Sequence, residues 1–258
     1  MINVEDEKYI EEVINKNQNV SILTACLNES GSIGKWLDQV SNVIQGTKCN
    51  SVKELVIVDD GSKDGTIDII IDKSKNFPIP IKLIRRDVRM GTLNAQIIGS
   101  RACSSEYILI LDCDLQHPVD FIIDFLEKLE DEPDIIIGSR YMPGGYNKWS
   151  TYRGFVSRSA TFLSQILISG ARRVKDPLSG YFLIKKSLIS DLTPYEGTFK
   201  PLLYAISMAN NPKMIEIPII MESRESGVSK IVTNPVKVVL RYIKEILVFF
   251  KSSKMKDD

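Results

Sequence analysis

Residues 107–118, with the sequence Y-I-L-I-L-D-C-D-L-Q-H-P, constrain the fold of this chain more than any other stretch. An apolar run that ends abruptly on two carboxylates is typical of a buried parallel strand that carries charge to the carboxyl edge of a sheet. Open α/β sheets bind their ligands at that edge. The stretch therefore predicts an α/β sheet with a site beside Asp112 and Asp114.

These two aspartates flank only Cys113, so an extended backbone would point both carboxylates the same way. Two hard oxygen ligands suit Mg²⁺ or Mn²⁺, and Gln116 continues the spacing with a neutral oxygen. The structural alternative is a polar strand end with a helix cap before Pro118, because loops are rich in Asp for turn chemistry alone.

Strands and helices are predicted to alternate along the first half of the chain. Apolar runs predict further strands at 20–25, 55–58, 81–84 and 134–137, and helical spacing predicts helices that include 91–102 and 118–129. This order predicts a doubly wound, mainly parallel sheet. Later segments predict helices at 155–169 and 202–209, a short strand ending at 184 and an edge strand at 214–220 that contains Pro218.

Composition excludes several classes of protein. Lys plus Arg equals Asp plus Glu at 33 each, which argues against a nucleic-acid binder that works through bulk charge. The four cysteines form no C-x-x-C pair and there is one histidine, which favours reduced thiols over a disulfide framework or a structural zinc site. We expect neither a signal peptide nor a membrane span, because no apolar run reaches ~18 residues.

We expect three parts along the chain: a polar leader at 1–17, one α/β domain at 18–232, and an amphipathic helix with a basic tail at 233–258. In the last part Lys237, Arg241, Lys244 and Glu245 gather on one helical face and leave a broad apolar face. Such a helix fits a membrane interface, and it equally fits docking on the protein's own sheet.

Acidic residues follow three of the predicted strands. Glu29 follows the first, Asp59 and Asp60 follow the second, and the two aspartates described above follow the fourth. Along one edge of a parallel sheet they would serve a nucleotide and a metal ion, by accepting hydrogen bonds and by holding a cation on a diphosphate. Neither G-x-G-x-x-G after the first strand nor a P-loop motif is present, so the metal and side chains would have to meet the phosphates.

Six motifs, taken in order, resemble the family 2 glycosyltransferases of GT-A fold. They are V-S-I-L-T-A-C-L-N-E, V-D-D-G-S-K-D-G-T, D-C-D-L-Q-H-P, G-S-R-Y, D-P-L-S-G-Y and R-E-S-G-V-S-K, and they span about residues 20–231. Within that family D-x-D-L-Q-H-P and S-R-x-A-T-F-L resemble the dolichyl-phosphate mannose synthases. The resemblance implies inverting transfer of mannose from GDP-mannose to dolichyl (polyprenyl) phosphate, with a divalent metal ion on the donor.

The same resemblance implies roles for individual residues, with a nucleotide-sugar half at about 18–140 and an acceptor half at about 141–232. The implied nucleotide-sugar-binding residues are Ala25, Leu27, Glu29, Asp59, Asp60, Gly91, Asp112 and Cys113. The implied metal ligands are Asp112, Asp114 and Gln116. The implied catalytic residues, with the cations placed around the phosphates, are Asp114, Arg140, Arg153, Arg158, Arg224 and Lys230.

The chain also departs from the family pattern. Ala25, Cys26 and Leu27 stand where P-A-Y is usual, and Leu93 stands where a second glycine is usual. The alternatives are therefore UDP-glucose as donor to the same lipid, a non-lipid acceptor, and an inactive membrane-associated binding module. We expect a peripheral protein on the cytosolic face of a membrane, with a membrane-spanning partner subunit as a further expectation.

Overall fold

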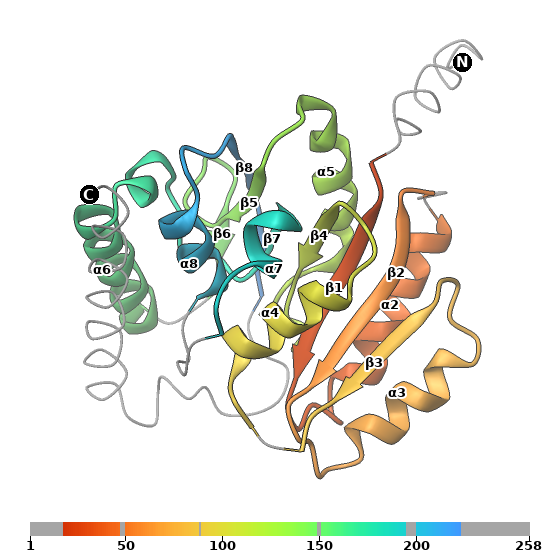
Figure 1. The fold of residues 1–258 in the computed structure, drawn as a ribbon. Helices are drawn as coiled ribbons and strands as arrows, with labels where there is room; N and C mark the ends of the chain where they lie inside the picture. The colour runs from red at the N-terminus through yellow and green to blue at the C-terminus, as the bar shows by residue number, and fades with distance from the viewer. Residues whose placement is uncertain (1–17, 47–49, 88, 149–150, 195–199, 223–258) are drawn as a thin grey trace, which may run out of the picture.

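The computed structural model describes residues 18–46, 50–87, 89–148, 151–194 and 200–222 (Figure 1). The expected leader at 1–17 and the expected terminal helix at 233–258 lie outside these residues. None of the helices in the described ranges is both long and apolar enough to cross a bilayer.

A seven-stranded sheet forms the centre of the molecule, in the order β3-β2-β1-β4-β7-β5-β8. Its strands are β1 (Val20–Cys26), β2 (Val52–Asp59), β3 (Ile81–Arg85), β4 (Tyr107–Ile110), β5 (Ile135–Ser139), β7 (Phe182–Lys185) and β8 (Met214–Pro218). All neighbouring pairs are parallel except those of β7, which runs antiparallel to β4 and β5. The predicted mainly parallel α/β sheet is confirmed.

Helices cover both faces of this sheet (Figure 1). They are α2 (Ile33–Gly46), α3 (Thr66–Ser74), α4 (Thr92–Ala102), α5 (Ile122–Glu127), α6 (Thr151–Leu167), α7 (Ser187–Ser190) and α8 (Pro201–Met208), with 3-10 turns at Val119–Phe121, Lys128–Asp131 and Gly170–Arg173. Side chains alternate across each strand, so Ile22 packs in one apolar cluster with Trp36 of α2, while Leu23 packs in another with Leu93 of α4.

Two predicted elements are divided in the structure. The helix expected at 118–129 is a short α-helix between two 3-10 turns. The strand expected at 214–220 ends at Pro218, and β9 (Ile220–Met221) then pairs with β6 (Tyr146–Asn147) in a separate two-stranded sheet. Proline has no N–H for the ladder, which favours the break at that residue.

Candidate active site

The acidic strand ends meet because β2, β1 and β4 are neighbours in the sheet. The chain leaves β1 toward β2 on one side, and β4 lies on the other side, so the order reverses between β1 and β4. Open sheets form their binding crevice at such a point, outside the carboxyl ends of the strands. A cavity of about 280 Å³ lies there, lined by Ala25, Cys26, Leu27, Glu29, Asp60, Arg89, Gly91, Thr92, Ala95, Gln96, Asp112, Cys113, Asp114, Gly180, Lys200 and Pro201.

Asp112 and Asp114 both line this cleft, although the geometry differs from the extended strand that the spacing suggested. The strand β4 ends at Ile110, Asp112 follows it, and Asp114 lies in the bend at residues 113–117. An Asp114 carboxylate oxygen accepts the backbone N–H of Gln116 at 3.1 Å. Leu115 between them has φ 63°, a left-handed conformation that is strained for a residue with a side chain. A tight turn, rather than strand pleating, therefore presents the carboxylates.

His117 and Gly180 support this turn from below. Nδ1 of His117 accepts the backbone N–H of Asp112 at 3.1 Å, so the imidazole proton is on Nε2. Burial lowers the pKa of His117 below its usual range, which keeps the ring neutral. A Cβ atom on Gly180 would lie 3.2 Å from Cε1 of His117 and 3.3 Å from Oδ2 of Asp112. A residue without a side chain therefore lets the segment before β7 approach Asp112 closely.

The two consecutive aspartates after β2 have different surroundings. Asp59 is fully buried and does not line the cleft; its Oδ1 accepts the backbone N–H groups of Gly61 at 3.1 Å and Ser62 at 2.9 Å. Asp60 lines the cleft, with Arg86 Nη1 at 3.3 Å from Oδ1.

Asp60 also fixes the start of helix α4. Its two carboxylate oxygens accept the backbone N–H groups of Met90 at 3.1 Å and Gly91 at 2.9 Å. Gly91 has φ 91° and ψ 165°, a conformation that only glycine adopts readily. This side chain therefore serves both the cleft and the loop that forms one of its walls.

The segment after β1 forms the remaining part of this wall. Glu29 lines the cleft, and its Oε2 accepts the Ser32 hydroxyl at 2.9 Å at the start of α2. Ala25 and Leu27 line the cleft beside it. Burial raises the pKa of the Cys26 and Cys113 thiols, so both stay protonated and neither acts as a nucleophile.

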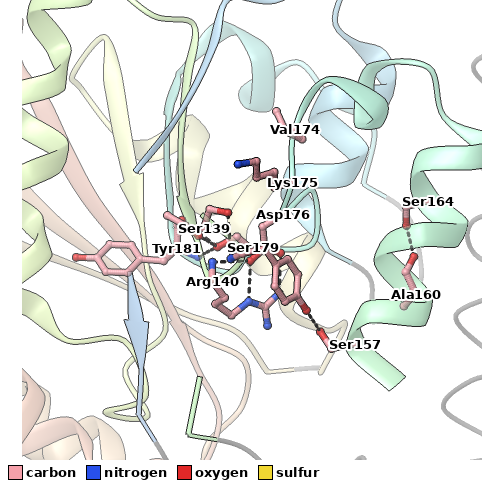
Figure 2. A network of polar contacts seen from close by, with 12 residues as sticks. Ser139, Arg140, Ser157, Ala160, Ser164, Val174, Lys175, Asp176, Ser179 and Tyr181 are labelled. Atoms are coloured by element: carbon pink, nitrogen blue, oxygen red, sulfur yellow. Dashed lines mark hydrogen bonds and ion pairs between the residues drawn. The ribbon is translucent and has the colours of Figure 1, made fainter. Parts of the chain in front are cut away.

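The structure does not bring Arg140 into the cleft. Its guanidinium donates from Nε and Nη2 to the two oxygens of Asp176, both at 2.7 Å, and its backbone N–H donates to the same carboxylate at 3.1 Å. Figure 2 shows the two side chains facing each other between the end of β5 and the segment before β7. Arg140 is nearly buried and Asp176 fully buried, so this pair holds the two segments together.

Arg158 and Gln116 also lie away from the described lining. Arg158 is exposed on α6, with its guanidinium carbon 5.8 Å from the centre of the Tyr141 ring. Gln116 is buried, and its Nε2 donates to the carbonyl of Glu222 at 3.1 Å. The Arg153 side chain, Arg224 and Lys230 lie outside the described residues.

Several lining residues were missed by the sequence reasoning. They are Cys26, Arg89, Thr92, Ala95, Gln96, Gly180, Lys200 and Pro201. Arg89, in the loop between β3 and α4, could have been found because that loop leaves the same edge of the sheet as the acidic strand ends. Lys200 has no such signal, because it follows no parallel strand directly and lies in no motif.

The donor set suits a hard divalent cation. Mg²⁺ is usually held by one or two carboxylates together with substrate phosphate oxygens and water, and Asp112 and Asp114 supply two carboxylates in one cleft. Within the described ranges no three His, Cys, Asp or Glu side chains come together as a metal site of their own. The protein would therefore share the ion with a phosphate-bearing ligand.

A mainly parallel sheet of this order with an acidic cleft at its switch point is the architecture of the GT-A glycosyltransferases. The family model described as glycosyl transferase family 2 matches residues 21–193, and the chain belongs to that family.

Two curated relatives cover most of the chain. A dolichol-phosphate mannosyltransferase from Pyrococcus furiosus is 31% identical over 229 residues, which are 88% of this chain and 63% of that protein. A dolichol-phosphate mannosyltransferase from Saccharomyces cerevisiae is 29% identical over 206 residues, which are 76% of this chain and 75% of that protein. The chain thus spans less than two thirds of the Pyrococcus protein.

Solved structures agree on the fold. Glucosyl-3-phosphoglycerate synthase from Mycobacterium tuberculosis, solved with Mn²⁺, uridine diphosphate and its glucosylated product, gives a TM-score of 0.67 at 18% identity over 95% of this chain and 83% of that one. A mannosyltransferase from Pyrobaculum calidifontis, solved with GDP-Man and Mn²⁺, gives 0.56 at 13% identity over 97% and 81%.

Proposed function

We propose that this protein transfers mannose from GDP-mannose to dolichyl (polyprenyl) phosphate, with inversion at the anomeric carbon. The observation that carries the proposal is the meeting of Glu29, Asp60, Asp112 and Asp114 in one cleft at the switch point of the sheet. The names of the relatives from Pyrococcus furiosus and Saccharomyces cerevisiae support mannose and a dolichyl acceptor. The proposed enzyme domain spans residues 18–232.

In this proposal the cleft divides the donor between two groups of acids. Glu29 and Asp60 would accept hydrogen bonds from the nucleoside, beside Ala25 and Leu27. Asp112 and Asp114 would hold Mg²⁺ or Mn²⁺, which supplies positive charge to the donor diphosphate when bound. Gln116 as a third metal ligand stays a prediction, and so do nucleotide contacts from Asp59. The predicted phosphate contacts also stay predictions; they involve Arg140, Arg153, Arg158, Arg224 and Lys230.

The acceptor needs little help from a general base. A phosphomonoester has a second pKa of about 6 and is largely a dianion at neutral pH, so its oxygen is already a nucleophile. His117 is buried and neutral, and its Nδ1 is occupied by the Asp112 N–H. Its place beneath the cleft supports a role in positioning Asp112 rather than in accepting a proton from the acceptor.

An apolar stripe on α6 supports peripheral contact with a membrane, where a polyprenyl phosphate resides. Phe155, Phe162 and Ile166 are 71%, 65% and 48% exposed, and their spacing places them on one face of the helix. Arg158, also exposed, lies beside them and suits anionic headgroups. We propose that this stripe, called the α6 stripe below, rests on the cytosolic face of a bilayer.

The experiment that tests the proposed function offers each labelled nucleotide sugar with dolichyl phosphate and Mg²⁺ or Mn²⁺. We expect a mannolipid from GDP-mannose and at least a hundredfold less product from the Asp114→Ala variant, whose cleft lacks one of the two carboxylates. Absence of a lipid product with GDP-mannose would reject the proposal. A glucolipid from UDP-glucose would move it to the alternative donor, and turnover unchanged by Asp114→Ala would remove the metal role.

A further inference from the structure

The charges that line the cleft leave few positive groups for a phosphate ligand. Its described lining includes the carboxylates of Glu29, Asp60, Asp112 and Asp114, and the cations Arg89 and Lys200. Two phosphate-bearing substrates carry several negative charges into this acidic space, so fixed cations in addition to a metal ion are needed to bring them together.

Lys200 lines the same cleft as Asp112 and Asp114. It immediately precedes α8, which packs against α4, and residues of both helices line the cleft. Arg89, the other cation of the described lining, directly precedes the Met90 and Gly91 amides that bind Asp60.

The backbone at Lys200 is held by a rigid element. Its carbonyl accepts the backbone N–H of Tyr204 at 3.2 Å in the first turn of α8. Leu202 and Leu203, two and three residues further along the chain, are fully buried in the apolar cluster that also contains residues of α4. The side chain itself is half-buried and reaches the cleft, so it combines a fixed origin with access to a ligand.

Arg140 is not among the residues that line the cleft, and its guanidinium binds the fully buried Asp176. We propose that Lys200 is a phosphate-binding residue of the cleft, a proposal that rests on the proposed function. The phosphate is either the donor diphosphate or the acceptor phosphomonoester, which share the chemistry that an ammonium group recognises.

The benefit to the reaction is electrostatic. An acceptor phosphate oxygen bonds to the anomeric carbon as the bond from that carbon to the diphosphate oxygen breaks, and the electron pair passes to the diphosphate. Lys200 next to either phosphate lowers the repulsion between the two anions, and next to the diphosphate it also stabilises the charge that develops there. No proton has to move to or from the lysine in this step.

The test measures binding without turnover. The wild type, Lys200→Gln, Lys200→Arg and the exposed control Lys128→Gln, on the turn after α5, are titrated with GDP and Mn²⁺ by calorimetry. A second titration adds farnesyl phosphate with GDP and Mn²⁺ present. A charged hydrogen bond changes affinity by a factor on the order of 10 to 100. Lys200→Gln should therefore lower the affinity for GDP or for farnesyl phosphate by that factor. The affinities of Lys200→Arg should stay within a few-fold of those of the wild type, and the affinities of Lys128→Gln should equal those of the wild type.

Each result has a defined meaning. A loss confined to GDP assigns Lys200 to the donor diphosphate, and a loss confined to farnesyl phosphate assigns it to the acceptor. Equal binding by Lys200→Gln and wild type in both titrations overturns the proposal. It is also overturned if Lys200→Gln and Lys200→Arg lose affinity equally and their melting temperatures fall equally. If the wild type binds a nucleoside diphosphate through Lys200 but makes no mannolipid, the proposed function fails and the phosphate role stands.

Discussion

Replacing Arg140 by Met separates two roles for this residue, the phosphate contact that its motif implies and the structural pair that the fold contains. Asp176 is fully buried and accepts the guanidinium through both oxygens at 2.7 Å. The variant leaves that carboxylate with the backbone N–H of residue 140 as its remaining donor from this position. Removing one partner of a buried ion pair costs about 3–5 kcal/mol.

For a domain of this size 1 kcal/mol shifts the melting temperature by about 2–4 °C, so Arg140→Met should melt roughly 6–20 °C below wild type. Circular dichroism on heating measures the shift. The matched control is Arg158→Met, because Arg158 contacts the same Tyr141 ring from an exposed position and its loss should cost under about 1 kcal/mol.

The double variant Arg140→Met with Asp176→Asn sharpens the result. Asparagine keeps an oxygen for the backbone N–H of residue 140 and removes the uncompensated buried charge, so part of the lost stability should return. The structural reasoning is refuted if Arg140→Met melts with the wild type while its affinity for GDP and Mn²⁺ falls more than tenfold. That outcome would place the guanidinium on a phosphate, as the motif implies.

Two further predictions concern other parts of the fold. Burial by itself would raise the pKa of Glu54, but the Lys82 ammonium and the serine donors outweigh it and lower that pKa to about 2. The stabilisation by the ionised Glu54 carboxylate is therefore present above the unfolded pKa of about 4.3 and is lost as pH falls toward 2. The urea midpoints of Glu54→Gln and wild type should differ at pH 7 and converge below pH 4. A difference that stays constant with pH would contradict this. At the α6 stripe, the double variant Phe155→Ser with Phe162→Ser should reduce co-sedimentation with anionic liposomes at least fivefold. The control is Ile71→Ser, which replaces an exposed apolar residue on α3 and should not reduce it. An equal loss of co-sedimentation in the double variant and the control would argue against a specific surface.

The position of the acidic site could be predicted from the sequence because it depends on local rules. Parallel strands joined by helices bring their carboxyl ends to one edge of the sheet. The carboxylates that follow β1, β2 and β4 were therefore expected at one edge, and these three strands are neighbours in the sheet. The direction of each carboxylate was harder to predict. Asp59 and Asp60 are adjacent in one motif, yet one caps a buried turn and the other faces the cleft.

The remaining features depend on contacts between distant segments. Arg140 and Asp176 are 36 residues apart and meet because β5 and β7 are antiparallel neighbours, which no periodicity in the sequence specifies. Lys200 reaches the cleft because α8 packs on α4, so its role could not be inferred before the helices were placed. Local rules thus located the acids, and non-local packing decided which cations accompany them.

Membership of a motif does not by itself distinguish a ligand-binding residue from one that supports the site. Asp59 shares a motif with Asp60, His117 shares one with Asp114, and Arg140 belongs to the matched motif G-S-R-Y. Asp59, His117 and Arg140 are nevertheless buried and direct their polar atoms at backbone amides or at Asp176. The contacts of Asp59 and His117 hold the turns after β2 and β4, including the strained turn at Leu115, and the pair of Arg140 and Asp176 joins the end of β5 to the segment before β7. A site that must hold a metal ion and two anions in fixed positions needs such supporting groups, because a misplaced carboxylate loses more in transition-state stabilisation than one flexible contact can recover. Burial and hydrogen-bond partners are therefore the observations that divide the motif residues into those that support the turns and those that face the substrate.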